Sequence, residues 1–278
     1  MIQKRIDHYA EAFLREAERL PSGSREPLLK GRRAIVTGGG KGIGKGITLR
    51  LAAAGADVLI CGCGNMEMAE ETAQEARSMG VRAEAFCADL AREDAAGQIV
   101  QEAARFLGGV DILVSNAAYQ PNLDLQDYTP ERFEKVLQIN LWSPVRLVSA
   151  CVPYLRQSGH GRIILISSIH GKRPSGFDIA YATSKGGIQM LMREAALELR
   201  RDEITVNAIL PGGTHVEFKS GETFQMPHKR VKRGREYERA FGTGSPSDSG
   251  NLAVFLASDM ASYITGTSIR VDGGIVLF

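Results

Sequence analysis

The stretch RAIVTGGGKGIGKGI, residues 33–47, decides the interpretation of the whole sequence. Its first five residues are an apolar run typical of a buried strand, and glycines follow directly before a helical pattern begins. Gly38 suits a tight turn, Gly42 lets the backbone approach a pyrophosphate, and Gly44 permits close contact between helix and strand. The N–H groups and the positive dipole at the start of such a helix favour phosphate groups. The stretch therefore predicts a dinucleotide-binding turn.

The rest of the chain alternates between apolar, strand-like runs and helical patterns. Strands are expected at residues 33–37, 57–61, 82–87, 111–115, 162–167, 204–209 and 268–271. Helices are expected near residues 43–54, 65–79, 91–106, 130–157, 182–200 and 247–258. Strands that are almost uniformly apolar, each followed by a helix, indicate a parallel sheet covered on both faces. We therefore expect an α/β fold of the Rossmann type, with a doubly wound parallel sheet of about seven strands.

Composition excludes several classes of protein. The 278 residues are 44% hydrophobic and 24% charged, which is ordinary for a globular protein and unlike a disordered chain. The net charge of +2 gives no electrostatic reason to expect a nucleic-acid partner. No stretch approaches the roughly 18 apolar residues that cross a membrane. The four cysteines lack the spacing of zinc sites or disulfide frameworks, which favours a reducing, cytoplasmic location and no bound metal.

The alternation is interrupted near the N-terminus and again late in the chain. Residues 2–20 carry apolar side chains at steps of three and four, which predicts an amphipathic helix. We assign residues 1–30 to this helix and its linker, and residues 31–278 to a single Rossmann-type domain. Residues 213–245 are long and polar, which predicts a substrate lid. The basic run at 228–235 suits an anionic substrate, an acidic carrier protein or a solvated surface.

Further motifs follow the glycine turn in a definite order. They are Asp89-Leu90, Asn116-Ala117-Ala118, Asn140, Ser168, Tyr181-Ala182-Thr183-Ser184-Lys185, Pro211-Gly212 and Val271-Asp272-Gly273-Gly274. Together with the spacing T-G-x-x-x-G-x-G of the turn, they resemble the short-chain dehydrogenase/reductase family over residues 33–274. The chain departs from the family at Ala118, because the family motif N-A-G has glycine there.

The resemblance implies a nicotinamide cofactor. The implied cofactor contacts are Thr37, Gly38, Gly40, Lys41, Gly42, Ile43, Gly44, Asp89, Leu90, Asn116, Ala117, Tyr181, Lys185, Pro211, Gly212 and Thr214. Gly62 stands where NAD-selective members of the family carry aspartate, and Lys41 is able to attract a 2′-phosphate. We therefore expect NADP(H) to be preferred. NAD(H) stays open, because Cys63 replaces the arginine often found next to the acidic position.

Hydride transfer between a nicotinamide and a ketone or secondary alcohol requires a proton to be moved at the oxygen. The ordinary pKa of a tyrosine hydroxyl is about 10, and a lysine cation nearby lowers that pKa. Tyr181 and Lys185 are four residues apart and therefore share one helix face. Ser168 lies thirteen residues before Tyr181 and is able to stabilise charge on the substrate oxygen. By the resemblance, Lys185 also holds the nicotinamide ribose, and Asn140 holds a water that relays protons.

These residues predict an enzyme that interconverts a ketone and a secondary alcohol, with Tyr181, Ser168, Lys185 and Asn140 as its catalytic residues. A 3-oxoacyl thioester and a sugar or polyol both stay open as substrates. The alternative is a non-catalytic dinucleotide-binding sensor on the same fold, for which a Ser-Tyr-Lys set has no chemical purpose. The resemblance also implies a homotetramer or homodimer assembled through the long helices near residues 130–157 and 182–200.

Overall fold

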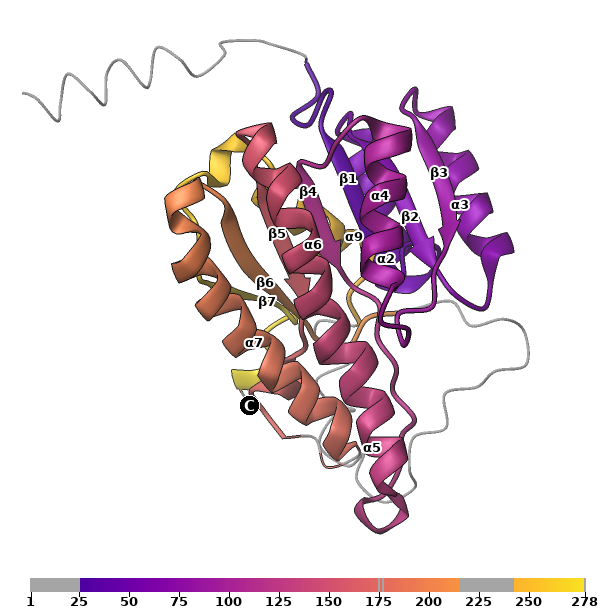
Figure 1. The fold of residues 1–278 in the computed structure, drawn as a ribbon. Coiled ribbons are helices and arrows are strands. Elements are labelled where there is room, and N and C mark those ends of the chain that lie inside the picture. The colour runs from indigo at the N-terminus through magenta and orange to yellow at the C-terminus, as the bar shows by residue number, and fades with distance from the viewer. Residues whose placement is uncertain (1–25, 175, 177, 216–242, 278) are drawn as a thin grey trace, which may run out of the picture.

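A computed structural model describes residues 26–174, 176, 178–215 and 243–277. Its centre is a seven-stranded sheet in the order β3-β2-β1-β4-β5-β6-β7 (Figure 1). The strands are β1 (Arg33–Thr37), β2 (Asp57–Gly62), β3 (Ala83–Cys87), β4 (Ile112–Ser115), β5 (Arg162–Ile166), β6 (Thr205–Pro211) and β7 (Ser268–Val271). Every neighbouring pair is parallel. The expected doubly wound parallel sheet is confirmed.

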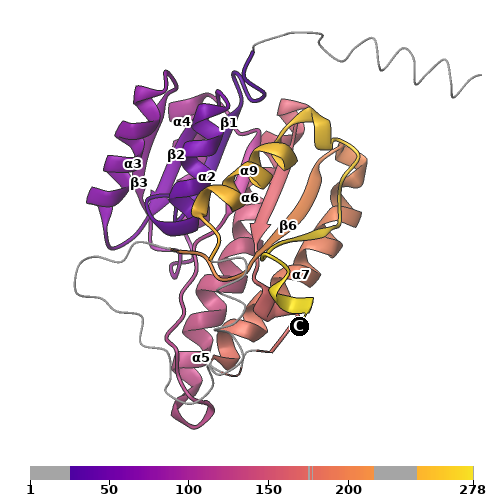
Figure 2. The ribbon, with the colours of Figure 1, turned by 180° about the vertical axis from the view of Figure 1, so that it is seen from behind.

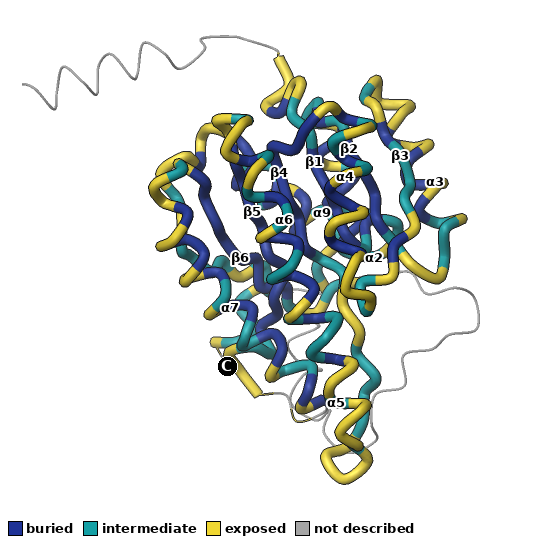
Figure 3. The backbone as a smooth tube through the Cα atoms, viewed as in Figure 1, coloured by how far each residue is buried: buried dark blue, intermediate teal, exposed yellow. Residues whose placement is uncertain are grey.

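Helices cover both faces of the sheet. They are α2 (Gly42–Ala53), α3 (Met66–Ser78), α4 (Ala95–Leu107), α5 (Pro130–Leu137), α6 (Ser143–Ser158), α7 (Ile179–Leu199) and α9 (Pro246–Ala257). One core joins the sheet to α4, α6 and α7, and the other joins it to α2, α3 and α9 (Figures 1 and 2). Alternate strand residues supply the two cores, so that Ile35 faces the first and Val36 the second. The five inner strands are almost entirely buried, the edge strands β3 and β7 are only partly buried, and the helices alternate between buried and exposed residues (Figure 3).

The helices differ from the sequence prediction at two places that matter for the site. α7 begins at Ile179, before the expected residue 182, because Asp178 caps it and accepts a hydrogen bond from Tyr181 N at 2.8 Å. The long helix expected over 130–157 is interrupted by a π-helical segment, η2 (Gln138–Trp142), between α5 and α6. Pro144 has no N–H to donate to the carbonyl four residues earlier, and the helix widens in front of it.

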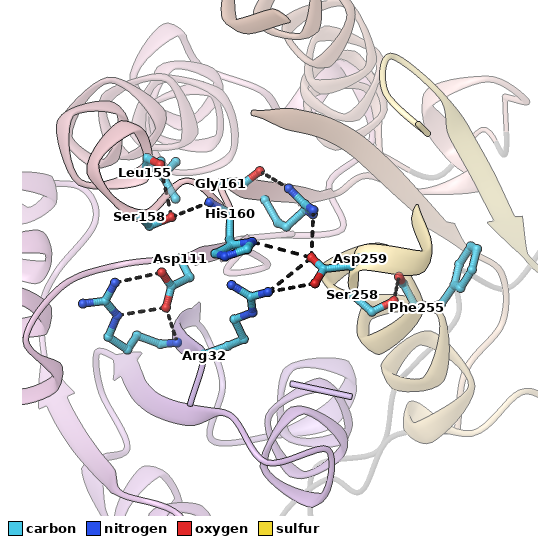
Figure 4. Close-up of polar contacts among 11 residues, drawn as sticks. Arg32, Asp111, Leu155, Ser158, His160, Gly161, Phe255, Ser258 and Asp259 are labelled. Carbon is cyan, nitrogen blue, oxygen red and sulfur yellow. Dashed lines mark hydrogen bonds and ion pairs between the residues drawn. The ribbon is translucent and has the colours of Figure 1, made fainter. Parts of the chain in front are cut away.

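A network of ion pairs joins the amino ends of the strands. Asp111 accepts hydrogen bonds from Arg33 N, Nε and Nη2, each at 2.8 Å. Burial alone would raise the pKa of Asp111, but the bonds from Arg33 hold that pKa below its ordinary value. Asp259 accepts from Arg32 at 3.0 Å and from Arg162 at 3.3 Å, close to Asp111 (Figure 4). The network fixes the edge of the sheet that lies opposite the glycine turn.

Some sequence predictions lie outside the described residues. These are the N-terminal helix at 2–20, the basic run at 228–235 and the part of the lid between 216 and 242. Within the part of the chain that the structure describes, no helix is long and apolar enough to cross a membrane.

Candidate active site

The glycine turn lies at the carboxyl end of β1 and has the backbone that the sequence predicts. Gly38 and Gly42 have φ values of +64° and +52°, which disfavour any residue with a side chain. A Cβ on Gly44 would lie 2.0 Å from the Gly38 carbonyl oxygen, so only glycine lets α2 start this close to β1. A Cβ on Gly40 would lie 2.7 Å from the Cα of Ala69 in α3. The turn therefore forms a shallow cradle of bare backbone.

Hydrogen bonds join the glycine turn to the chain leaving β4. The Thr37 hydroxyl oxygen accepts from Asn116 N at 3.0 Å and from Ala117 N at 3.1 Å. In return, Asn116 Nδ2 donates to the carbonyl oxygens of Thr37 at 2.9 Å and Gly38 at 3.2 Å. Thr37 and Asn116 therefore use these side-chain groups to shape the cradle.

The start of α2 is open to an anion. Lys41 takes the N-cap position in an extended conformation, and no side chain caps the first turn. The N–H groups of that turn and the exposed Lys41 together suit a phosphate. At the end of β2, Gly62 has an ordinary φ and open space within 4 Å of any added Cβ. The exposed Asp89 accepts from Ala91 N at 3.0 Å just after β3.

β5 and α7 bring the predicted catalytic residues together. Ser168 directly follows Ser167 beyond β5 and is only 6% exposed, and its oxygen accepts from His170 N at 3.1 Å. The Ser168 side chain also acts on the Tyr181 hydroxyl, whose pKa it lowers. Ser167 donates instead to the Lys185 carbonyl oxygen at 2.7 Å, away from the Tyr181 hydroxyl. The structure thus separates the two neighbouring serines as strand alternation predicts.

Lys185 is buried beneath Tyr181. Its Nζ donates to the Ile166 carbonyl oxygen at 2.8 Å and lies 5.5 Å from the centroid of the Tyr181 ring. Burial lowers the pKa of Lys185 to about 8. Burial also raises the pKa of Tyr181 above its ordinary value, and the Ser168 side chain only partly opposes this rise. Desolvation dominates both groups, and Lys185 is not among the groups that shift the Tyr181 pKa, so the expected lowering of that pKa by Lys185 stays a prediction.

Asn140 lies in the π-helical segment and is 1% exposed. Its Oδ1 accepts from Tyr119 N at 2.7 Å, and its Nδ2 donates to the Tyr119 carbonyl oxygen at 2.9 Å and to Ser184 Oγ at 3.1 Å. The side chain thereby joins the loop after β4 to α7. A water relay through Asn140 stays a prediction, and the observed bonds show a holding role for its amide group.

The remaining predicted residues lie at the carboxyl ends of β6 and β3. Pro211 ends β6, and a Cβ on Gly212 would lie 2.8 Å from the Cα of Asp272. Thr214 Oγ1 donates to the Gly212 carbonyl oxygen at 3.3 Å. Leu90 packs against the core that contains α4. Among the described residues, no group of three or more His, Cys, Asp or Glu is placed to hold a metal.

Sequence reasoning missed Asp178, which contacts the backbone of Tyr181. Aspartate three residues before Tyr181 is a typical helix N-cap, so the local pattern contained a usable signal. Its partners Asn122 and Tyr128 are distant in the sequence and become visible only in the fold.

Comparison with known proteins agrees with this geometry. The family model described as enoyl-(acyl carrier protein) reductase matches residues 38–276. The chain belongs to the short-chain dehydrogenase/reductase family. This short-chain dehydrogenase/reductase is 34% identical to a D-beta-hydroxybutyrate dehydrogenase of Cupriavidus necator, over 90% of this chain and 99% of the relative. It is 32% identical to an L-rhamnose 1-dehydrogenase (NAD(P)(+)) of Sphingomonas sp., over 89% of this chain and 97% of the relative.

Solved structures show the same fold. The crystal structure of an acetoin dehydrogenase from Salmonella typhimurium superposes on this short-chain dehydrogenase/reductase with a TM-score of 0.79 at 32% identity. The superposition covers 88% of this chain and 96% of the acetoin dehydrogenase. The enzymes named here are oxidoreductases, in agreement with a dinucleotide-binding turn and a Ser-Tyr-Lys set.

Proposed function

We propose that this short-chain dehydrogenase/reductase is an NADP(H)-preferring enzyme that interconverts a ketone and a secondary alcohol. The observation that carries the proposal is the meeting of Ser168, Tyr181 and Lys185 at the same edge of the sheet as the glycine turn. The bound nicotinamide supplies or accepts the hydride. The turn at Gly38, Gly42 and Gly44 suits the pyrophosphate of such a cofactor, because positive φ values at Gly38 and Gly42 and the close approach of Gly44 to Gly38 keep bare backbone there.

The chain's own residues handle the proton. During ketone reduction, the Tyr181 hydroxyl donates a proton to the substrate oxygen, and a raised pKa keeps this donor protonated at neutral pH. The Ser168 hydroxyl donates a hydrogen bond to the same oxygen as negative charge develops there. Lys185 supplies a proton to Tyr181 and holds the nicotinamide ribose, and Asn140 completes the route to solvent. Alcohol oxidation uses the same groups in reverse, so its rate rises as Tyr181 loses its proton.

Cofactor preference follows from the end of β2. Gly62 presents no carboxylate to repel a 2′-phosphate, and the exposed Lys41 offers it a positive charge. These two residues support NADP(H) over NAD(H).

Two substrate classes fit the site and the relatives. The description of the family model favours an acyl thioester, and the rhamnose dehydrogenase favours a sugar. We also propose a cytoplasmic homotetramer or homodimer with α6 and α7 at the interface. Met190 and Leu197 of α7 are 54% and 67% exposed, and an assembly would bury these large apolar side chains.

A screen of the purified full chain tests the proposal. Nicotinamide absorbance is followed with NADP(H) and NAD(H) over 3-oxoacyl thioesters, sugars and steroids. We expect turnover with NADPH and one ketone class, and its loss by a factor of about 10² to 10⁴ in Tyr181→Phe. Unchanged activity in Tyr181→Phe would refute the mechanism. Cofactor binding without turnover on any substrate would instead support the sensor alternative.

A further inference from the structure

Asp178 joins three segments that surround the candidate site. Its Oδ1 accepts hydrogen bonds from Tyr181 N at 2.8 Å and from the Tyr128 hydroxyl at 2.6 Å. Its Oδ2 accepts from Asn122 N at 2.9 Å. Tyr181 belongs to the first turn of α7, Tyr128 lies two residues before α5, and Asn122 lies in the loop after β4. One carboxylate therefore connects the catalytic helix to both neighbours.

The burial of Asp178 exceeds what a simple helix cap requires. The residue is 5% exposed, and no salt bridge to it is found among the described residues. Burying a carboxylate is unfavourable unless hydrogen bonds replace its water, and here neutral donors and the N-terminus of α7 do so. Serine or asparagine would cap α7 equally well at lower cost. Capping therefore does not explain the carboxylate, whereas its hydrogen bonds to Asn122 and Tyr128 do.

The loop held by Asp178 has an uncommon backbone conformation. Asn122 has a φ of +56°, in the left-handed region that asparagine adopts more readily than most residues with a side chain. Its Oδ1 is buried without a hydrogen-bond partner in the described structure, so the backbone bond to Asp178 is the only hydrogen bond found for Asn122 among the described residues. The same loop is held at Tyr119 by Asn140. Asp178 and Asn140 thus fix the loop at two separate points.

We propose that Asp178 is a positioning residue, which locks the loop after β4 to the first turn of α7 and thereby orients Tyr181 toward the substrate. The proposal rests on the proposed function for the identity of the reacting group. The influences found on the Tyr181 hydroxyl are burial, the Ser168 hydroxyl and the negative charge of Asp178, with Lys185 beneath the ring. The Asp178 charge raises the pKa of Tyr181 and so helps to keep the proton donor protonated.

Asp178→Ser separates positioning from capping. Serine still caps α7 but removes the charge and the contacts to Asn122 and Tyr128. We expect kcat to fall about tenfold or more, since a misplacement of 1 Å can cost about 100-fold, while the cofactor Kd changes less than about threefold. We also expect the pH profile of reduction to shift to lower pH. Tyr128→Phe keeps the charge and should lower kcat by less, without moving the pH profile.

Asp111→Asn is the matched control, because Asp111 is also buried and accepts three hydrogen bonds, but at the opposite edge of the sheet. It should lower thermal stability and leave kcat unchanged. Wild-type kcat and pH profile in Asp178→Ser would overturn the proposal. An equal fall in kcat in Asp111→Asn would overturn it as well, because general destabilisation would then explain both.

Two readouts need no substrate and keep the proposal separate from the proposed function. Amide exchange at Asn122 should accelerate in Asp178→Ser, and ultraviolet titration against Tyr181→Phe should show a lower pKa for Tyr181. If the wild-type chain turns over no ketone, the proposed function fails, yet these readouts still decide the role of Asp178. Wild-type values in both would reject it.

Discussion

Buried charged side chains have different partners at the amino ends of the strands and at their carboxyl ends. At the amino ends, Asp111 faces Arg33, and Asp259 binds both Arg32 and Arg162. At the carboxyl ends, the buried Lys185 donates to a backbone carbonyl, and no salt bridge to it is found among the described residues. A buried charge without an opposite charge is costly, so stability alone does not explain that edge. The comparison teaches that paired charges join the amino ends of the strands, whereas the buried charge without a partner belongs to a residue that we propose to be catalytic.

Among the variants that test this difference, Lys185→Met should cause the largest change, which is a loss of turnover. The variant keeps the buried bulk but removes the ammonium, so we expect turnover to fall by a factor of about 10² to 10⁴. Steady-state kinetics with saturating NADPH measure the loss. Turnover within about threefold of wild type would show that the unpaired charge at this edge has no chemical role.

The same variant also tests how the buried Lys185 makes the free energy of unfolding depend on pH. The pKa of Lys185 is about 8 when folded and 10.5 when exposed, so the folded chain loses its proton first. Between pH 8 and 10 the unfolded chain binds more protons, and the free energy of unfolding should rise with pH. Denaturant titrations at several pH values should show this rise in wild type and a smaller one in Lys185→Met. Equal slopes would show that Lys185 is not desolvated.

Asp111→Asn should weaken the ion pairs at the amino ends of the strands and lower stability, without changing turnover. Three hydrogen bonds from Arg33 lose their charged acceptor, so we expect a loss of about 1–3 kcal/mol in the free energy of unfolding. Denaturant titration measures it at neutral pH. A stability loss below about 0.5 kcal/mol would show that the ion pairs do not hold the amino ends.

Gly62→Asp should introduce a charge at the carboxyl edge with a smaller and more selective effect. Nothing lies within 4 Å of an added Cβ, so the fold should be unchanged, while the new carboxylate repels a 2′-phosphate. We expect the kcat/KM ratio of NADPH to NADH to fall about tenfold, or about 1.4 kcal/mol. Gly97→Asp is the control, because Gly97 is an exposed glycine of α4 with equally open space. A similar fall in Gly97→Asp would refute a local effect.

His160→Ala should have the smallest effect. His160 Nδ1 lies 3.7 Å from Asp259, and the two side chains are 49% and 65% exposed. Exposed pairs of this kind contribute little, so the free energy of unfolding should change by less than about 0.5 kcal/mol. Thermal melts of the variant and the wild type would detect a larger contribution, which would show that the ion-pair network extends to the protein surface.

The sequence allowed the sheet, the glycine turn and the grouping of the candidate catalytic residues to be predicted because their determinants are local. Apolar runs such as residues 33–37 mark buried parallel strands, and Tyr181 and Lys185 carry their spacing with them. The role of Asp178 was not predictable, because its partners come from other segments. The rise in the pKa of Tyr181 was also hidden, since it depends on burial, which a spacing of four residues does not reveal.

The π-helical segment at Gln138–Trp142 acts as a single-residue insertion in an otherwise regular rod. Each residue of an α-helix turns the chain by about 100°, so one surplus residue rotates everything before it relative to everything after it. α6 keeps Leu147 and Cys151 in the core, while Asn140 is turned toward the loop after β4. Deleting one residue here would leave α6 packed against the core but turn Asn140 away from Tyr119, so that their hydrogen bonds would be lost. The register of one helical turn therefore sets the shape of the substrate side.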